Sequence, residues 1–395
     1  MAQSTFETKT AELEHYIAQT ALERQRKQEQ ASGRYAVEEI YRKQGERIAN
    51  DFPWDKHHSR RLADTCRELC LWLGSACDID VATSDDVTVV RTALSSPALQ
   101  STFSTKIGSG VAAGYGEVVD TTAGLTYEMS SPEFLSNDVV TIEETTRLRR
   151  HRKGHPATHV QFAGATTPRS VVPYEAQLAF DGMDIVDSAT TTGAYLMAAA
   201  ELGRAARRLY LDLVWSKFLN NPTMYDGTAL FHTNHANLIT TAMGATGLTG
   251  AATKLAGQTF VANDGAKIHL GLTPKYLVCA SAILETARET ARKYQLDGDK
   301  GNLIVVPESR LGAAGVTDPE AETIVTGADT YWGLFAPASQ RPAIVVSYLQ
   351  GSSTAPMVDF YTLDRGQWGM GWTVKLRVGV AFIDWRTMVF STGVA

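Results

Sequence analysis

The most informative stretch of the sequence is residues 192–219, TGAYLMAAAELGRAARRLYLDLVWSKFL, followed by Asn220-Asn221-Pro222 and then by residues 226–238, DGTALFHTNHANL. Within 192–219, apolar residues recur at alternating spacings of three and four, which lines one face of a helix. These residues are Tyr195, Ala199, Leu202, Ala206, Leu209 and Leu213. The pattern predicts one amphipathic helix, roughly 40 Å long at about 1.5 Å per residue, which Pro222 ends.

A helix of this length is typical of a structural spine, because most helices of globular proteins are shorter. Gly203 lies inside it at a cost in helix propensity. It indicates either that another backbone passes close to this position or simply a tolerated glycine.

Composition limits the classes of protein. The chain has 395 residues, 44% of them hydrophobic, which is ordinary for a globular protein with two or more sizeable cores. The formal net charge of -6 argues against a dedicated nucleic-acid binder, although a shell that encloses DNA would tolerate it. No apolar run approaches the roughly 20 residues that cross a bilayer, and the N-terminus has no secretion signal, so we expect a soluble protein made in the cytosol.

The four cysteines are expected to be buried thiols, since a long chain without a secretion signal has no need of disulfides. Cys66 and Cys70 lie one helical turn apart beside leucines, which favours core packing over metal binding.

The first hundred residues differ from the rest in composition and pattern. They have charge-rich helical patterns at about 3–31, 35–49 and 59–74. Their apolar stripes are narrow, which suits helices that pack on a partner. We therefore expect an extended arm; the alternative is a small independent helical domain.

A basic run lies between two strand-like stretches, 139–145 and 158–162, and predicts a long hairpin with a charged tip. Five cationic side chains fall within seven positions: Arg147, Arg149, Arg150, Arg152 and Lys153. Their mutual repulsion favours an anionic partner. Acidic surface on a neighbouring copy of the chain is the main candidate, with DNA or an ordinary solvated loop as alternatives.

The last third is rich in strand patterns. Residues 372–382 alternate apolar and polar side chains, and with 344–349 and 357–361 they predict a β-meander. Before them we expect a loop at 240–257, a strand at 276–279, a helix at 281–294 and a strand at 303–306, together forming an inserted α/β domain.

His232 and His235 could offer two imidazoles to a divalent metal, with Asp226 as a third ligand, as in a metal-dependent hydrolase. The spacing differs from that of helical zinc sites, and no glutamate intervenes. We instead expect Asp226, His232, His235 and Asn237 to hydrogen-bond backbone in a tight loop at a domain junction. The sequence also lacks a Gly-x-Ser-x-Gly nucleophile motif, a phosphate loop and a dinucleotide fingerprint, so we predict no enzyme and no cofactor.

Several ordered segments together resemble the Mu-like group of tailed-phage major capsid proteins. They are Thr83-Ser84-Asp85, the 192–219 helix, Asp226-Gly227 with Leu230-Phe231-His232 and His235-Ala236-Asn237-Leu238, Pro274-Lys275-Tyr276-Leu277, and Ile383-Asp384-Trp385-Arg386. The resemblance implies an α+β fold like the shell of phage HK-ninety-seven. The implied parts are a helical N-terminal arm (1–104), the start of a peripheral domain (105–137), an E-loop hairpin (138–170), the peripheral domain with the spine helix (171–222), an axial domain (223–343) and the peripheral β-meander (344–395).

The resemblance also implies a function. Such proteins self-assemble as hexamers and pentamers into an icosahedral head that encloses double-stranded DNA, contacted without sequence specificity. The implied partners are further copies of the chain, a portal at one vertex, a scaffolding protein, and decoration or minor capsid proteins, with no membrane. The protein would be a virion component assembled in the bacterial cytoplasm. An encapsulin-type compartment, which holds cargo protein, is the alternative shell.

Overall fold

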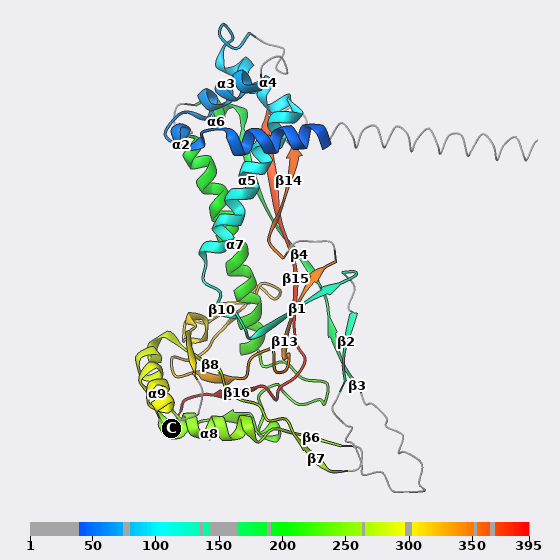
Figure 1. Ribbon diagram of the computed structural model, residues 1–395, viewed down its shortest axis with the longest axis vertical. Helices are drawn as coiled ribbons and strands as arrows, with labels where there is room; N and C mark the ends of the chain where they lie inside the picture. Colours follow the sequence, from blue (N-terminus) through cyan, green and yellow to red (C-terminus); the bar gives the residue numbers. More distant parts are fainter. Residues whose placement is uncertain are drawn as a thin grey trace, which may run out of the picture. The chain divides into compact units, whose positions relative to one another are not determined.

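The computed structural model describes residues 39–73, 80–134, 137–142, 164–187, 191–262, 265–296, 302–350, 354–363 and 368–394 (Figure 1). The chain forms two compact units. The first is built from residues up to 110 with 177–200 and 358–373, and the second from 111–176, 201–357 and 374–395. Five of the described elements, α5, α7, β4, β14 and β15, contribute residues to both. No helix among the described residues is both long enough and apolar enough to span a membrane.

The first unit is mainly helical. After a helix that covers residues 39–51, its elements are α2 (Trp54–His57), α3 (Leu62–Leu73), α4 (Asp86–Ser95), the start of α5 (Pro97–Glu117), the end of β4 (Val172–Asp181), α6 (Gly182–Val186), the start of α7 (Thr192–Leu219), β14 (Met357–Thr362) and the start of β15 (Gly369–Phe382). Its core centres on the fully buried ring of Tyr195, whose centroid lies 5.8 Å from that of Phe103 and 5.5 Å from that of Trp372.

Of the expected N-terminal arm, 1–104, the structure describes residues 39–73 and 80–104. The narrow apolar stripes of these helices bury their side chains against residues that come much later in the sequence, such as Tyr195 and Trp372. The expected helix at 3–31 lies outside the described residues. Cys66 and Cys70 are buried as predicted, and burial raises the pKa of the Cys66 thiol to about 12.

The sequence reading missed α4. Asp85 caps it by accepting a hydrogen bond from Thr88 N at 3.4 Å. The buried residues Val89, Val90 and Ala93 give the helical spacing that could have revealed it.

The second unit holds most of one five-stranded sheet and all of another. The first sheet has the order β1-β13-β15-β14, with β4 also pairing with β15; here β1 is Thr126–Ser131 and β13 is Ile344–Leu349. The second has the order β5-β16-β12-β8-β9: Leu238–Ile239, Met388–Ser391, Trp332–Phe335, Tyr276–Cys279 and Ile304–Pro307.

Short elements complete the second unit. They are the helices α8 (Ala245–Ala256) and α9 (Leu284–Leu296), the 3-10 turns η2 (Thr233–His235), η3 (Ser281–Ile283) and η4 (Ser309–Leu311), and three antiparallel strand pairs: β2 (Asn137–Ile142) with β3 (Gly164–Arg169), β6 (Thr259–Val261) with β7 (Lys267–His269), and β10 (Val316–Thr317) with β11 (Ile324–Val325).

Three predictions about the second half of the chain need correction. The three C-terminal strands do not form a meander, because β15 lies between β13 and β14; β15 is buried along nearly all its length and is long enough to pair on both sides. The expected loop at 240–257 contains α8, whose buried Leu248, Ala251 and Leu255 form an apolar stripe. The inserted α/β region is not self-contained, since its sheet includes β16 from the C-terminus.

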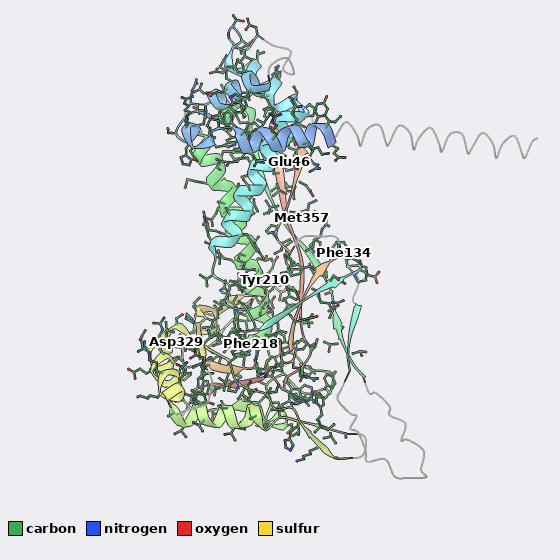
Figure 2. The ribbon with its side chains drawn as sticks, in the orientation of Figure 1. Glu46, Phe134, Tyr210, Phe218, Asp329 and Met357 are labelled. Atoms are coloured by element: carbon green, nitrogen blue, oxygen red, sulfur yellow. The ribbon has the colours of Figure 1, made fainter. Side chains whose placement is uncertain are left out.

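The helix predicted at 192–219 is confirmed by α7. Its C-terminal part is buried on most sides, and Figure 2 labels Phe218 there. The ring of Phe218 contacts those of Trp215, Phe231 and Phe390 at centroid distances of 5.4, 4.8 and 5.5 Å. This core joins the C-terminal part of the helix to strands of both sheets.

Gly203 is where two backbones meet, as one of the two readings of the sequence proposed. A Cβ atom there would lie 2.0 Å from Val111 O and 2.8 Å from Tyr115 N, both on α5. Only glycine lets α5 approach α7 this closely.

Candidate functional site: the polar network after the long helix

Asn221 lies two residues after the end of α7 and is the first residue of the polar network. It adopts a left-handed conformation with φ 48°, which asparagine tolerates better than most residues. Its side-chain amide pairs with one residue of the following loop: Phe231 N donates to Asn221 Oδ1 at 2.7 Å, and Asn221 Nδ2 donates to Phe231 O at 3.2 Å. The loop from Pro222 to Phe231 is therefore closed at both ends by Asn221.

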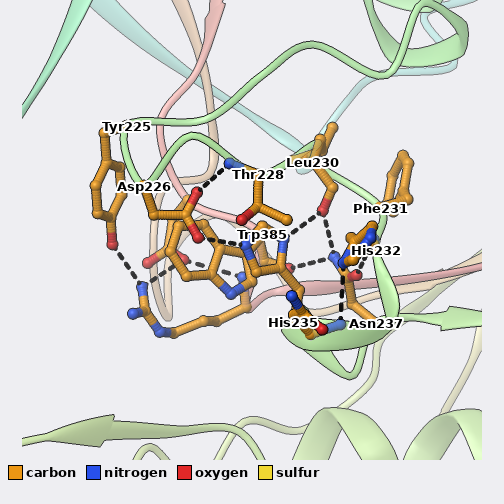
Figure 3. A network of polar contacts seen from close by, with 12 residues as sticks. Tyr225, Asp226, Thr228, Leu230, Phe231, His232, His235, Asn237 and Trp385 are labelled. Atoms are coloured by element: carbon orange, nitrogen blue, oxygen red, sulfur yellow. Dashed lines mark hydrogen bonds and ion pairs between the residues drawn. The ribbon is translucent and has the colours of Figure 1, made fainter.

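Asp226 and Gly227 form the turn within this loop. Asp226 Oδ1 accepts from Thr228 N at 3.0 Å, and Gly227 takes φ 79°, a conformation that favours glycine. The turn leaves Asp226 Oδ2 facing His235 (Figure 3).

His235 is held at both ring nitrogens. Nδ1 lies 3.1 Å from Leu230 O and Nε2 lies 2.8 Å from Asp226 Oδ2, and the side chain is 4% exposed. Each ring nitrogen therefore faces an oxygen atom, and the two contacts fix the orientation of the imidazole ring.

His232 and Asn237 order the turn on either side of His235. His232 Nδ1 accepts from Asn234 N at 3.1 Å and caps η2. Asn237 is fully buried; its Oδ1 accepts from His232 N at 3.1 Å and its Nδ2 donates to Leu230 O at 2.8 Å. The expected hydrogen bonds from this segment to backbone are therefore present.

The same segment contacts the Ile383-Asp384-Trp385-Arg386 motif. The rings of His235 and Trp385 stack with centroids 4.0 Å apart and planes at 10°, and Asn237 Nδ2 donates to Trp385 O at 3.3 Å. Two motifs that are about 150 residues apart thus form one site. All four predicted junction residues belong to it, and the site lies within the second unit.

An ion-pair cluster adjoins Trp385. Asp384, 1% exposed, accepts from Arg386 Nη1 at 3.2 Å and from Arg341 Nε. Both guanidinium groups lie over the ring of Phe260, at 3.8 Å for Arg386 and 4.5 Å for Arg341. Arg386 also donates to Tyr225 OH at 3.2 Å. The sequence reading missed Arg341, Phe260 and Tyr225, since no local pattern links them to the motif.

The network lowers the pKa of the Asp226 carboxyl, and this shift makes the stability of the fold depend on pH. Burial opposes ionisation of Asp226, but the hydrogen bonds from His235 and from Thr228 outweigh it and lower the pKa of the carboxyl below its ordinary value of 3.8. A depressed carboxyl pKa contributes stability above the ordinary value, and this contribution is lost as pH falls through the folded-state pKa.

We therefore expect Asp226→Asn to lower the thermal unfolding midpoint at pH 7, and we expect the difference from the wild type to shrink below pH about 3.8, where the wild-type carboxyl also becomes neutral. Thermal unfolding of both proteins between pH 7 and pH about 3 measures this. A difference that stays constant with pH would show that the Asp226 charge does not stabilise the fold.

The polar atoms of His235 and Asp226 that could act on a substrate or bind a metal already have protein partners. Both nitrogens of His235 and both oxygens of Asp226 face protein partners. Among the residues that the structure describes, no group of three His, Cys, Asp or Glu side chains is placed to hold a metal ion. The basic run Arg147, Arg149, Arg150, Arg152 and Lys153 lies outside the described residues, as does the strand expected at 158–162. The strands that flank the run, β2 and β3, pair antiparallel from Asn137–Arg169 to Ile142–Gly164.

Comparison with known proteins identifies the class of protein. A family model described as phage capsid protein matches residues 164–390, which is more than half of the chain and includes β3, the long helix and the whole network. The chain belongs to the phage capsid protein family. It is a shell protein that assembles with further copies of itself into a phage capsid. The match supports this family without resolving the Mu-like group within it.

Solved shell structures are similar to this chain at low identity. The mature capsid of bacteriophage PhiM1 is 12% identical, with 69% of this chain and 87% of that one covered and a TM-score of 0.45. The procapsid of bacteriophage JBD30 is 16% identical, with 75% of each chain covered and a TM-score of 0.41. The SrpI encapsulin of Synechococcus elongatus is 9% identical, with 68% and 84% covered and a TM-score of 0.41. No curated protein sequence matched significantly.

Proposed function

We propose that this chain is the subunit of hexamers and pentamers that close into an icosahedral phage head around double-stranded DNA. The observation that carries the proposal is the phage capsid family match over residues 164–390. A shell of this kind needs a rigid tile, because many modest contacts between identical copies must add up in one geometry. The α5–α7 contact at Gly203 and the network around His235 supply this rigidity within the second unit.

The proposed partners go beyond further copies of the chain. They are a portal at one vertex, a scaffolding protein, decoration or minor capsid proteins, and packaged DNA contacted without sequence specificity. The net charge of -6 fits a shell that encloses DNA without binding it strongly. Assembly would take place in the cytoplasm of the bacterial host, without a membrane.

We assign the network a structural role and no catalytic one. Both ring nitrogens of His235 face oxygen atoms, and Nδ1 of His232 caps a turn, so these atoms are engaged within the subunit. Elemental analysis of the wild type and of His232→Ala and His235→Ala proteins tests this. A bound metal that both variants lose would support the hydrolase alternative.

The hairpin that β2 and β3 begin is proposed to be the E-loop (138–170), lying over an adjacent subunit, and residues 1–104 are proposed to form the arm. Replacing Arg149, Arg150 and Arg152 together by glutamate should reduce particle yield, because the reversed charges would repel acidic surface on the neighbour. Far-UV circular dichroism of the subunit should stay unchanged. The matched control replaces the same three residues by lysine, which keeps the charge; equal yields from the glutamate and lysine variants would argue against this interlock.

Electron microscopy of the purified protein tests the proposed function itself. Hollow polyhedral particles with nucleic acid inside after infection are the expected result. Particles that hold cargo protein and never nucleic acid would favour the encapsulin-type compartment. A monomer that forms no particles would contradict both.

A further inference from the structure

Arg169, the last residue of β3, is a partly buried arginine with neutral partners. Its Nη1 donates to Ser347 Oγ at 2.9 Å and its Nη2 donates to Ser130 O at 3.3 Å. Its Nε is buried and has no hydrogen-bond partner. Burial lowers the pKa of this guanidinium from its ordinary value, because no carboxylate offsets the lost hydration.

Five other partly buried arginines among the described residues each form an ion pair with a carboxylate. Arg207 pairs with Asp120 at 2.7 Å, Arg67 pairs with Asp86 at 2.7 Å, and Arg310 pairs with Asp212 and Glu308. Arg341 and Arg386 share Asp384. Against these five, Arg169 has no carboxylate within ion-pair distance in the described parts of the chain. An unpaired charge removed from water is costly, so the part of the subunit that the structure describes leaves Arg169 poorly compensated.

A second arginine lies on the same face of the sheet. Gly379 on β15 is opposite Ser347 on β13, and Arg377 lies two residues from Gly379, so Arg377 and Ser347 share a face. The guanidinium of Arg377 lies 5.9 Å from the ring centroid of Phe134, which is 45% exposed, and it too has no described carboxylate partner. The face thus carries two guanidinium groups and an exposed aromatic ring.

We infer that Arg169, together with Arg377, binds a carboxylate of a second copy of this chain in the assembled shell. The occupant follows from charge and from context. The five paired arginines named above all have carboxylate partners, and the chain has 43 acidic against 37 basic residues. In a capsid, each copy of the chain is surrounded by further copies that carry these carboxylates. A carboxylate fits the planar guanidinium, which offers further N–H donors besides those bound to Ser347 and Ser130. This inference rests on the proposed function.

The inference predicts opposite effects on the subunit and on the shell. Arg169→Gln removes the charge but keeps a side-chain amide that can donate to Ser347. The thermal unfolding midpoint of the unassembled subunit should stay the same or rise, since a poorly compensated charge is gone. Particle yield at a fixed subunit concentration should fall at least about tenfold, because the carboxylate of the neighbour is left without its partner.

Two further variants sharpen the test. Arg169→Lys keeps the charge and should recover part of the yield. Arg288→Gln removes an exposed arginine that pairs with Glu285 on its own helix, and it should change neither measurement. A lower unfolding midpoint for the Arg169→Gln subunit would show that the residue acts within one chain, and wild-type particle yield from this variant would show that no neighbour uses it; either result overturns the inference while the proposed function stands.

The test also separates a carboxylate from a phosphate of packaged DNA. Empty particles assembled without DNA should already show the loss. If only DNA-filled particles of Arg169→Gln lost stability, the partner would be nucleic acid and the inference would be wrong. Wild-type protein that formed no particles would overturn both the inference and the proposed function.

Discussion

Replacing Asp384 by asparagine is expected to lower the free energy of unfolding of the subunit by about 3–5 kcal/mol, the range measured when one partner of a buried ion pair is removed. Asp384 is 1% exposed and is the carboxylate that Arg341 and Arg386 share, with side chains only 12% and 10% exposed. Asparagine has nearly the same shape, so the loss would come from charge and not from a cavity. The guanidinium groups of Arg341 and Arg386, which lie over Phe260, would both lose this carboxylate.

Urea denaturation of the unassembled subunit, followed by tryptophan fluorescence, measures this effect. The matched control is Glu285→Gln, which breaks the ion pair with Arg288 on the surface of α9, where Glu285 is 80% exposed. Exposed pairs contribute about 0–1 kcal/mol, so the control should remain near the wild-type value. If Asp384→Asn stayed equally near it, Asp384 would not hold the two arginines in place.

Replacing Gly203 by alanine is expected to cost about 3 kcal/mol and to reduce particle yield sharply, because overpacking against backbone cannot be relieved by turning a side chain. The added Cβ would lie 2.0 Å from Val111 O and 2.9 Å from Val111 C. The two helices would have to separate, and Tyr210 and Arg207 on α7, which contact residues on and just after α5, would lose their partners. Outside such a contact, the same substitution in a helix would stabilise it.

Gly108 on α5 provides that comparison. A Cβ atom there meets nothing within 4 Å, so Gly108→Ala should leave stability unchanged or raise it by up to about 1 kcal/mol. Denaturation of the Gly203→Ala and Gly108→Ala proteins measures their stabilities, and particle counts by electron microscopy measure their assembly. Equal stability of the two alanine variants would mean that α5 and α7 do not touch at Gly203.

The position of the junction residues was only partly predictable. Hydrogen bonds from His232 and Asn237 to nearby backbone follow from polar residues in a short loop after Pro222, and the sequence indicated them. That Trp385 stacks on His235, and that Arg341 meets Asp384, did not follow from spacing. These partners are separated by 150 and 43 residues, and only the fold brings them together.

The sequence by itself determined the elements whose pattern is local. The helix Thr192–Leu219 and its end at Asn221, the strand Gly369–Phe382 and the helix Leu284–Leu296 follow from periodicity and from residues that stop a helix, since these depend on neighbours a few positions away. The tertiary structure alone decided that β15 separates β13 from β14, that α8 is a helix, and that residues 39–73 and 80–104 fold into a core with Tyr195 and Trp372. Those outcomes depend on which apolar faces are buried together, and side chains hundreds of residues apart settle that choice.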